Sequence, residues 1–290
     1  MWFSLEIKNK ILELADSLIE KTREIKIIDT HWHICLPKSD MLNVMNIFNI
    51  EKVFVIPLDF RGYSWDQVIS FVGMKSKPKE YIENVLTKTI FINNDAQLNG
   101  EPTLDDRFEF IPFISVCSPE LSFEEDNPYR NNLIVKIIPP FDDVTNDYWK
   151  KVIEIVERFS KRTIFMIHTG WGCKPKHLKE LIETYPDRKF IMAHMRDELD
   201  SDKYDRIMIM KSSSNVYSET SYCEHPLRIE EFVEKGFEDR LLFGSDFRVE
   251  KHISLIKHFS NCVSYARITD GQKKKIFYDN AAELIKGLST

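Results

Sequence analysis

The sequence predicts an α/β fold built on a parallel sheet, and three observations lead to that class. Short runs of apolar and β-branched residues recur along the chain, helical patterns lie between them, and 290 residues suit one barrel-sized domain. This alternation is typical of βαβ units, whose consecutive strands run parallel. We therefore expect a (β/α)8 TIM barrel, with a doubly wound open sheet as the alternative, because periodicity does not reveal closure.

The predicted elements follow in order from an amphipathic helix over about residues 1–25, where apolar side chains recur at helical spacing among charges. Eight candidate strands come next, each apolar enough to be covered on both faces. They lie at residues 26–29, 52–56, 110–116, 133–138, 163–167, 189–193, 215–218 and 240–244. The clearest helical pattern between strands lies at residues 148–159.

The stretch of about residues 57–106, after the second candidate strand, is too long for a plain crossover. It contains a helical pattern of its own, so we expect an insertion beside the mouth of the barrel. No internal repeat, low-complexity tract or linker divides the chain. Residues 1–290 are therefore predicted to form a single domain.

The charges and cysteines exclude several classes of protein. A net charge of -6, from 40 basic and 46 acidic residues spread along the chain, predicts neither nucleic acid nor an anionic membrane as partner. The 5 cysteines include no CxxC pair, which argues against a disulfide framework and a thiolate zinc site. With no signal peptide or membrane span expected, we predict a cytoplasmic protein with a small-molecule substrate. A homo-oligomer is left open.

The candidate functional residues lie where predicted strands end. His31 and His33 close the first strand, His168 the fifth and His194 the sixth, while Asp246 closes the eighth. In a parallel barrel all strands end on one face, where catalytic residues gather, so these side chains are expected to converge. Alternate residues of a strand project to the same side, so His31 and His33 can reach one ion.

Imidazole nitrogens with a carboxylate suit Zn²⁺, Mn²⁺, Fe²⁺ or Co²⁺ and leave a position for water, which such an ion makes more acidic. Asp246 is then placed to accept a proton from that water. His194 is placed to polarise a substrate oxygen or to carry a proton.

These residues lie in motifs that resemble the amidohydrolase superfamily, in particular its amidohydrolase-related branch that contains aminocarboxymuconate-semialdehyde decarboxylase. The motifs are IDTHWH at 28–33, VKIIP at 135–139, MIHTG at 166–170, MAH at 192–194, LFGSD at 242–246 and YDNAAEL at 278–284. They keep the order of the family across nearly the whole chain.

The resemblance implies a (β/α)8 barrel and a divalent cation, zinc first and Mn, Fe or Co as alternatives. It implies His31, His33, His168 and Asp246 as the metal ligands and His194 as a catalytic or second-metal histidine. Lys136 has two interpretations: a carboxylated bridge between two metals, as in two-metal members, or a lysine paired with a carboxylate in the barrel mouth.

Further candidates adjoin the strand ends. Arg61, Arg196 and Arg248 are candidates to hold a substrate carboxylate, Arg248 foremost. Trp32 and Trp171, each close to a predicted ligand, are candidates for a wall of the substrate pocket. Asp29 is expected to support a ligand histidine by hydrogen bonding.

The predicted function is hydrolysis of an amide, ester, lactone or ring C–N bond by metal-activated water, with Asp246 and His194 moving protons. The first alternative is non-oxidative decarboxylation of an aromatic or unsaturated carboxylic acid on the same metal. A second alternative from another class is a barrel that keeps the scaffold without catalysis. One metal ion per chain is expected.

Overall fold

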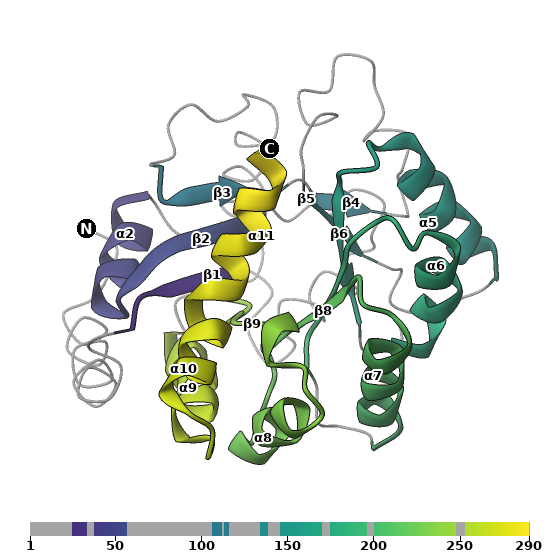
Figure 1. Cartoon of the computed structure of the whole chain (residues 1–290). Coiled ribbons are helices and arrows are strands. Elements are labelled where there is room, and N and C mark those ends of the chain that lie inside the picture. Colours follow the sequence, from purple (N-terminus) through teal and green to yellow (C-terminus); the bar gives the residue numbers. More distant parts are fainter. Residues whose placement is uncertain are drawn as a thin grey trace, which may run out of the picture.

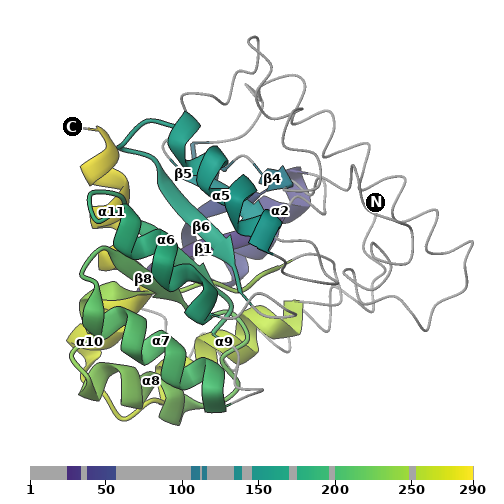
Figure 2. The ribbon, with the colours of Figure 1, turned by 90° about the vertical axis from the view of Figure 1, so that its right-hand side faces the viewer.

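The computed structural model describes residues 25–33, 38–56, 106–111, 113–115, 134–138, 146–169, 175–195, 200–247 and 253–289. In this part strands form the centre and helices surround them (Figures 1 and 2). The expected N-terminal helix and the expected insertion lie outside the described residues, apart from the last residue of each.

The strands pair in parallel throughout two sheets. The first sheet holds β1 (Ile27–His33), β2 (Ile50–Ile56) and β3 (Phe108–Phe110), in that order. The second runs in chain order through β4 (Phe113–Ser115), β5 (Ile134–Ile138), β6 (Ile164–His168), β7 (Phe190–Ala193), β8 (Val216–Glu219) and β9 (Leu241–Leu242). Each predicted strand therefore has a counterpart, with β3 and β4 sharing the third.

Two connections join these sheets into a ring. The chain passes from β3 into β4 over residues 111–112, and it pairs with β2 before that point and with β5 after it. On the other side, the backbone N–H groups of Thr30 and His33 donate to the carbonyls of Phe243 (2.9 Å) and Phe247 (2.8 Å). These bonds connect the first strand to the chain after the last one. The fold is the predicted TIM barrel.

The strands bury side chains on both faces, as their uninterrupted apolar runs require. On β5, Val135 and Ile137 pack outward into the core shared with the helices, whereas Ile134 and Ile138 belong to a second cluster with residues of β2, β6 and β9. Lys136 lies two residues from both Ile134 and Ile138, and alternate residues of a strand share a face, so Lys136 lies on the inner face with them.

Helices lie around the strands (Figure 1). They are α2 (Lys38–Ile47), α5 (Asn146–Arg158), α6 (Lys179–Thr184), α7 (Asp200–Ser212), α8 (Pro226–Glu234), α9 (Ile253–Tyr265), α10 (Asp270–Lys274) and α11 (Asn280–Ser289). Local chemistry sets several helix starts: Pro226 opens α8, and Thr269 with Gln272 forms a capping box on α10. In the described part, no helix has the length and apolarity needed to cross a membrane.

Candidate metal centre

The predicted strand-end residues lie on one face of the barrel and are buried. His31 and His33 belong to the end of β1, His168 ends β6, His194 directly follows β7, and Asp246 lies beyond β9. His194 and Asp246 have positive φ angles of 66° and 50°, which non-glycine residues rarely adopt and which are concentrated at functional sites.

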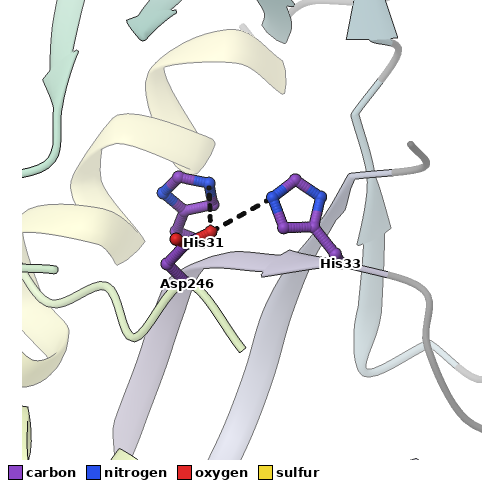
Figure 3. Close-up of side chains that lie close together, drawn as sticks. All are labelled: His31, His33 and Asp246. Atoms are coloured by element: carbon purple, nitrogen blue, oxygen red, sulfur yellow. Dashed lines mark ion pairs between the residues drawn. The ribbon is translucent and has the colours of Figure 1, made fainter. Parts of the chain in front are cut away.

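Three of these side chains meet at one point (Figure 3). Oδ1 of Asp246 lies 3.3 Å from Nε2 of His31 and 3.2 Å from Nε2 of His33. Nδ1 of His33 lies 3.0 Å from the carbonyl oxygen of Ile56, which only accepts, so Nδ1 carries the hydrogen and Nε2 presents a lone pair. Electron-pair donors gathered in this way suit a divalent cation, and the residues present therefore fit the metal that the sequence predicts.

His168 and His194 form the neighbouring part of the cluster. Nδ1 of His168 lies 2.8 Å from Nε2 of His194, and the ring of His194 lies 4.9 Å from that of His31 between centroids. Among the described residues, two sets place one ligand atom each within 4.8 Å of the others: His31, His33 and Asp246, and His31, His194 and Glu219. His168 belongs to neither set and is joined to the cluster through His194.

Lys136 reaches the same cluster from the inner face of β5. Its Nζ lies 3.2 Å from Nε2 of His31, and its side chain is fully buried. Burial and the charge of Lys136 both lower the pKa of His31, which favours the neutral imidazole. The position places the ammonium group beside a predicted ligand. Its two interpretations, carboxylated bridge or ion-pairing lysine, stay predictions.

Glu219, at the end of β8, was missing from the predicted set. Its carboxylate is fully buried and accepts hydrogen bonds from Nδ1 of His31 (3.0 Å), the backbone N–H of His194 (2.5 Å), and the backbone N–H (2.6 Å) and hydroxyl (2.7 Å) of Ser221. Burial raises the pKa of Glu219, but the hydrogen bond from His31, the charge of Lys136 and the hydrogen bond from Ser221 outweigh it, so the pKa lies below its usual value. The strand-end rule would have found Glu219, because it directly follows the predicted strand 215–218.

Asp29 fastens β1 to the segment that carries Asp246. Its Oδ1 accepts hydrogen bonds from the backbone N–H groups of His31 (3.1 Å) and Ser245 (3.0 Å). Burial raises the pKa of Asp29 to about 7. This placement agrees with the supporting role expected for Asp29.

Trp32 differs from the expectation that it lines the substrate pocket. Its indole is fully buried in the core outside the barrel, donates to Oγ of Ser245 (3.0 Å) and lies 4.7 Å from the ring of Phe247 between centroids. Neighbouring residues of a strand point to opposite faces, so a residue between two ligands faces away from them. Trp32 therefore contributes to packing.

Arg206 of α7 is a second residue that the sequence analysis did not select. Its buried guanidinium donates to the carbonyl oxygens of Ala193 and His194 and to the hydroxyls of Thr169 and Ser218. Three strand ends are thereby linked from behind the histidines. The remaining candidates, Arg61, Arg196, Arg248 and Trp171, lie outside the described residues.

Comparisons with known proteins agree with the fold. The family model described as "Amidohydrolase" matches residues 134–286, slightly more than half of the chain. No curated protein matches the sequence.

Solved structures resemble the chain over most of its length. An uncharacterized TIM-barrel protein from Bordetella bronchiseptica is 14% identical, with 92% of this chain and 100% of that chain covered and a TM-score of 0.59. A dihydroxybenzoic acid decarboxylase from Polaromonas sp. JS666, with bound manganese and the inhibitor 2-nitroresorcinol, is 15% identical, with 90% and 97% covered and a TM-score of 0.54. A probable 2-pyrone-4,6-dicarboxylic acid hydrolase from Acinetobacter baumannii, with citric acid bound, is 15% identical, with 90% and 100% covered and a TM-score of 0.52. These similarities support the barrel fold.

Proposed function

This chain belongs to the amidohydrolase family, and from that premise we propose that it hydrolyses an amide, ester, lactone or ring C–N bond of a small molecule. It is an enzyme of the hydrolase or decarboxylase kind that uses a divalent metal ion. The finer proposal concerns the reaction, the metal and the residues that carry them.

The observation that carries the proposal is the convergence of His31, His33 and Asp246 on one point. We assign these three as metal ligands and His168, which contacts His194, as the fourth. Zinc is the first choice for this nitrogen and oxygen set, while the manganese of the Polaromonas decarboxylase makes Mn²⁺ the main competitor. When bound, the cation supplies Lewis-acid chemistry, because it polarises a substrate oxygen and makes water more acidic.

We assign separate roles to the two carboxylate oxygens of Asp246, one in metal binding and one in proton transfer. Oδ1 faces the two imidazoles of β1, whereas Oδ2 lies 4.0 Å from Nδ1 of His194. We assign to Asp246 the acceptance of the proton that attacking water loses. His194, next to both Asp246 and His168, is assigned the second proton transfer.

The test is turnover of a panel of amides, esters, lactones and cyclic ureides by the protein reconstituted with Zn²⁺ or Mn²⁺. We expect incorporation of ¹⁸O from labelled water into one product, with kcat lowered about 1,000-fold or more in Asp246→Asn. The matched control is Glu230→Gln, which should keep the activity. Glu230 lies on α8 and its buried carboxylate pairs with Arg267, away from the candidate ligands. Equal turnover by wild type and Asp246→Asn would remove Asp246 from the mechanism.

Decarboxylation is the second candidate, and the buried Lys136 favours it. A fully buried ammonium group 3.2 Å from a predicted ligand offers a positive charge to an anionic substrate. The Polaromonas protein, similar in fold, is a dihydroxybenzoic acid decarboxylase. A panel of hydroxybenzoates and unsaturated carboxylic acids separates the two reactions: release of CO₂ without uptake of ¹⁸O from water would replace hydrolysis by lyase chemistry.

A further inference from the structure

We propose that Glu219 sets the tautomers of His31, His194 and His168 through a chain of hydrogen bonds with one direction. The chain places the ring hydrogen of each on Nδ1, so that Nε2 of His31 and of His168 keeps a lone pair outside the chain, whereas Nε2 of His194 accepts from His168 within it. The inference deepens the proposed function, because those lone pairs are what a metal ion or a proton would use. The chain of hydrogen bonds can nevertheless be tested separately, in the metal-free protein.

The direction of the chain starts from backbone N–H groups, which can only donate. Oε1 of Glu219 accepts from the backbone N–H of His194 (2.5 Å), and Oε2 accepts from the backbone N–H of Ser221 (2.6 Å). Because a backbone N–H only donates, both carboxylate oxygens of Glu219 must be acceptors. Any other polar hydrogen that approaches them has to come from the partner.

The first branch leads to His31. Nδ1 of His31 lies 3.0 Å from Oε1 of Glu219, so it carries the ring hydrogen and donates it. Nε2 of His31 then has the lone pair, on the side of Oδ1 of Asp246 at 3.3 Å. Carboxylates that hold metal-binding histidines in this way fix the tautomer and raise the basicity of the ligand nitrogen.

The second branch leads through Ser221 to two further histidines. The hydroxyl of Ser221 donates to Oε1 of Glu219 (2.7 Å), so its oxygen has to accept from Nδ1 of His194 (2.9 Å). With the hydrogen on Nδ1, Nε2 of His194 accepts from Nδ1 of His168 (2.8 Å). The hydrogen of His168 is thus on Nδ1, and its Nε2 has the lone pair required of the fourth ligand.

His33 provides an internal reference for this chain. Its Nδ1 donates to the carbonyl of Ile56 on β2, and no member of the Glu219 chain takes part in that bond. All four histidines therefore share one tautomer, but only three of them depend on Glu219. Glu219 is accordingly a positioning residue, which acts through the histidines.

The experiment is ¹⁵N-detected NMR of the metal-free protein, in which the ring nitrogen shifts of histidines report the tautomer. In the wild type we expect the hydrogen on Nδ1 of His31, His33, His168 and His194. Glu219→Gln should change the signals of His31, His194 and His168 and leave His33 unchanged. Ser221→Ala should change His194 and His168 but leave His31, while Glu230→Gln should change none of the four.

A second readout is the affinity for Zn²⁺ measured by competition with a chelator. Glu219→Gln is expected to weaken binding about 10- to 100-fold, as the loss of supporting carboxylates does elsewhere, and Glu230→Gln to leave it unchanged. Hydrogen on Nε2 of His31 or His168 in the wild type would overturn the inference, as would an unchanged affinity in Glu219→Gln. If that variant fails to fold, Ser221→Ala decides, because unchanged His194 and His168 signals contradict the second branch. If the wild type has the expected tautomers but binds no metal, the proposed function is contradicted and the inference on the tautomers stands.

Discussion

The two ends of the barrel strands differ in how far their carboxylates are buried and in the partners of those carboxylates. At the carboxyl ends, Glu219 and Asp246 are almost fully buried and contact imidazoles. At the amino ends, Glu51 is partly exposed and pairs with Lys26 and with the hydroxyl of Tyr278 (2.5 Å). Exposed ion pairs stabilise little, whereas a buried polar group that loses its partner costs much more, so chemistry and fragility are concentrated at one end.

The largest expected difference in stability concerns two arginines that bridge backbone carbonyls. Arg206 does so behind the carboxyl ends, and Arg240 does so at the start of β9, where it donates to the carbonyls of Ser213 (2.6 Å) and Met210 (2.7 Å). Arg206→Met should lower the free energy of unfolding by about 3 kcal/mol, because buried acceptors lose their donor. Arg240→Met, where water can replace the side chain, should cost about 1 kcal/mol. Urea unfolding measures both, and equal losses would contradict the distinction between the ends.

A glycine at the carboxyl ends should be as sensitive as the side chains there. A Cβ at Gly244 would meet Oε2 of Glu219 and lie 3.2 Å from Cβ of His31. Gly244→Ala is expected to displace the carboxylate, weakening metal binding about tenfold and lowering stability by about 1–3 kcal/mol. Gly271→Ala in α10, whose Cβ would have only a contact at 3.9 Å, should instead stabilise by up to about 1 kcal/mol. Chelator competition and thermal unfolding distinguish the two variants, and a neutral Gly244→Ala would show that Glu219 has room to move.

The pH dependence of stability should have opposite signs at the two ends. Burial raises the pKa of Asp29 from 3.8 to about 7, so the folded protein binds a proton more tightly than the unfolded chain does. Stability from this group is present at low pH and falls as the pH rises towards 7. Asp29→Asn should remove that decline. The difference between the metal-free wild type and the variant, followed by urea unfolding, isolates this residue, and a difference independent of pH would contradict the assignment.

At the amino ends the expected effect is smallest and runs the other way. Hydrogen bonds from Lys26 and then Tyr278 hold the pKa of Glu51 below its ordinary 4.5, so its contribution exists above that pH and is lost as the pH falls. Tyr278→Phe should cost less than about 1 kcal/mol at neutral pH, and progressively less as the pH falls below 4.5. Its metal affinity and turnover should equal those of the wild type. A loss of turnover would mean that the two ends are coupled.

The strand pattern and the strand-end rule were sufficient to predict the barrel and the cluster of His31, His33 and Asp246. Both depend on local periodicity, because strand parity orients side chains and parallel order brings the ends together. Trp32 was assigned to the pocket since it adjoins two ligands in sequence, although the same parity turns it outward. Arg206 lay beyond such reasoning: it acts from a helix, and the packing of α7 against the strands determines which carbonyls it reaches.

Metal content tests the central claim most directly, namely that the buried carboxyl ends of the strands hold one divalent ion. Plasma mass spectrometry of purified protein, after incubation with Zn²⁺ or Mn²⁺ and removal of excess ion, should find about one equivalent per chain. His33→Ala and Asp246→Asn should hold far less, and Tyr278→Phe should match the wild type. Two equivalents would make His194 and Lys136 ligands of a second ion. No stoichiometric metal in the wild type, or unchanged metal in the two ligand variants, would contradict the account.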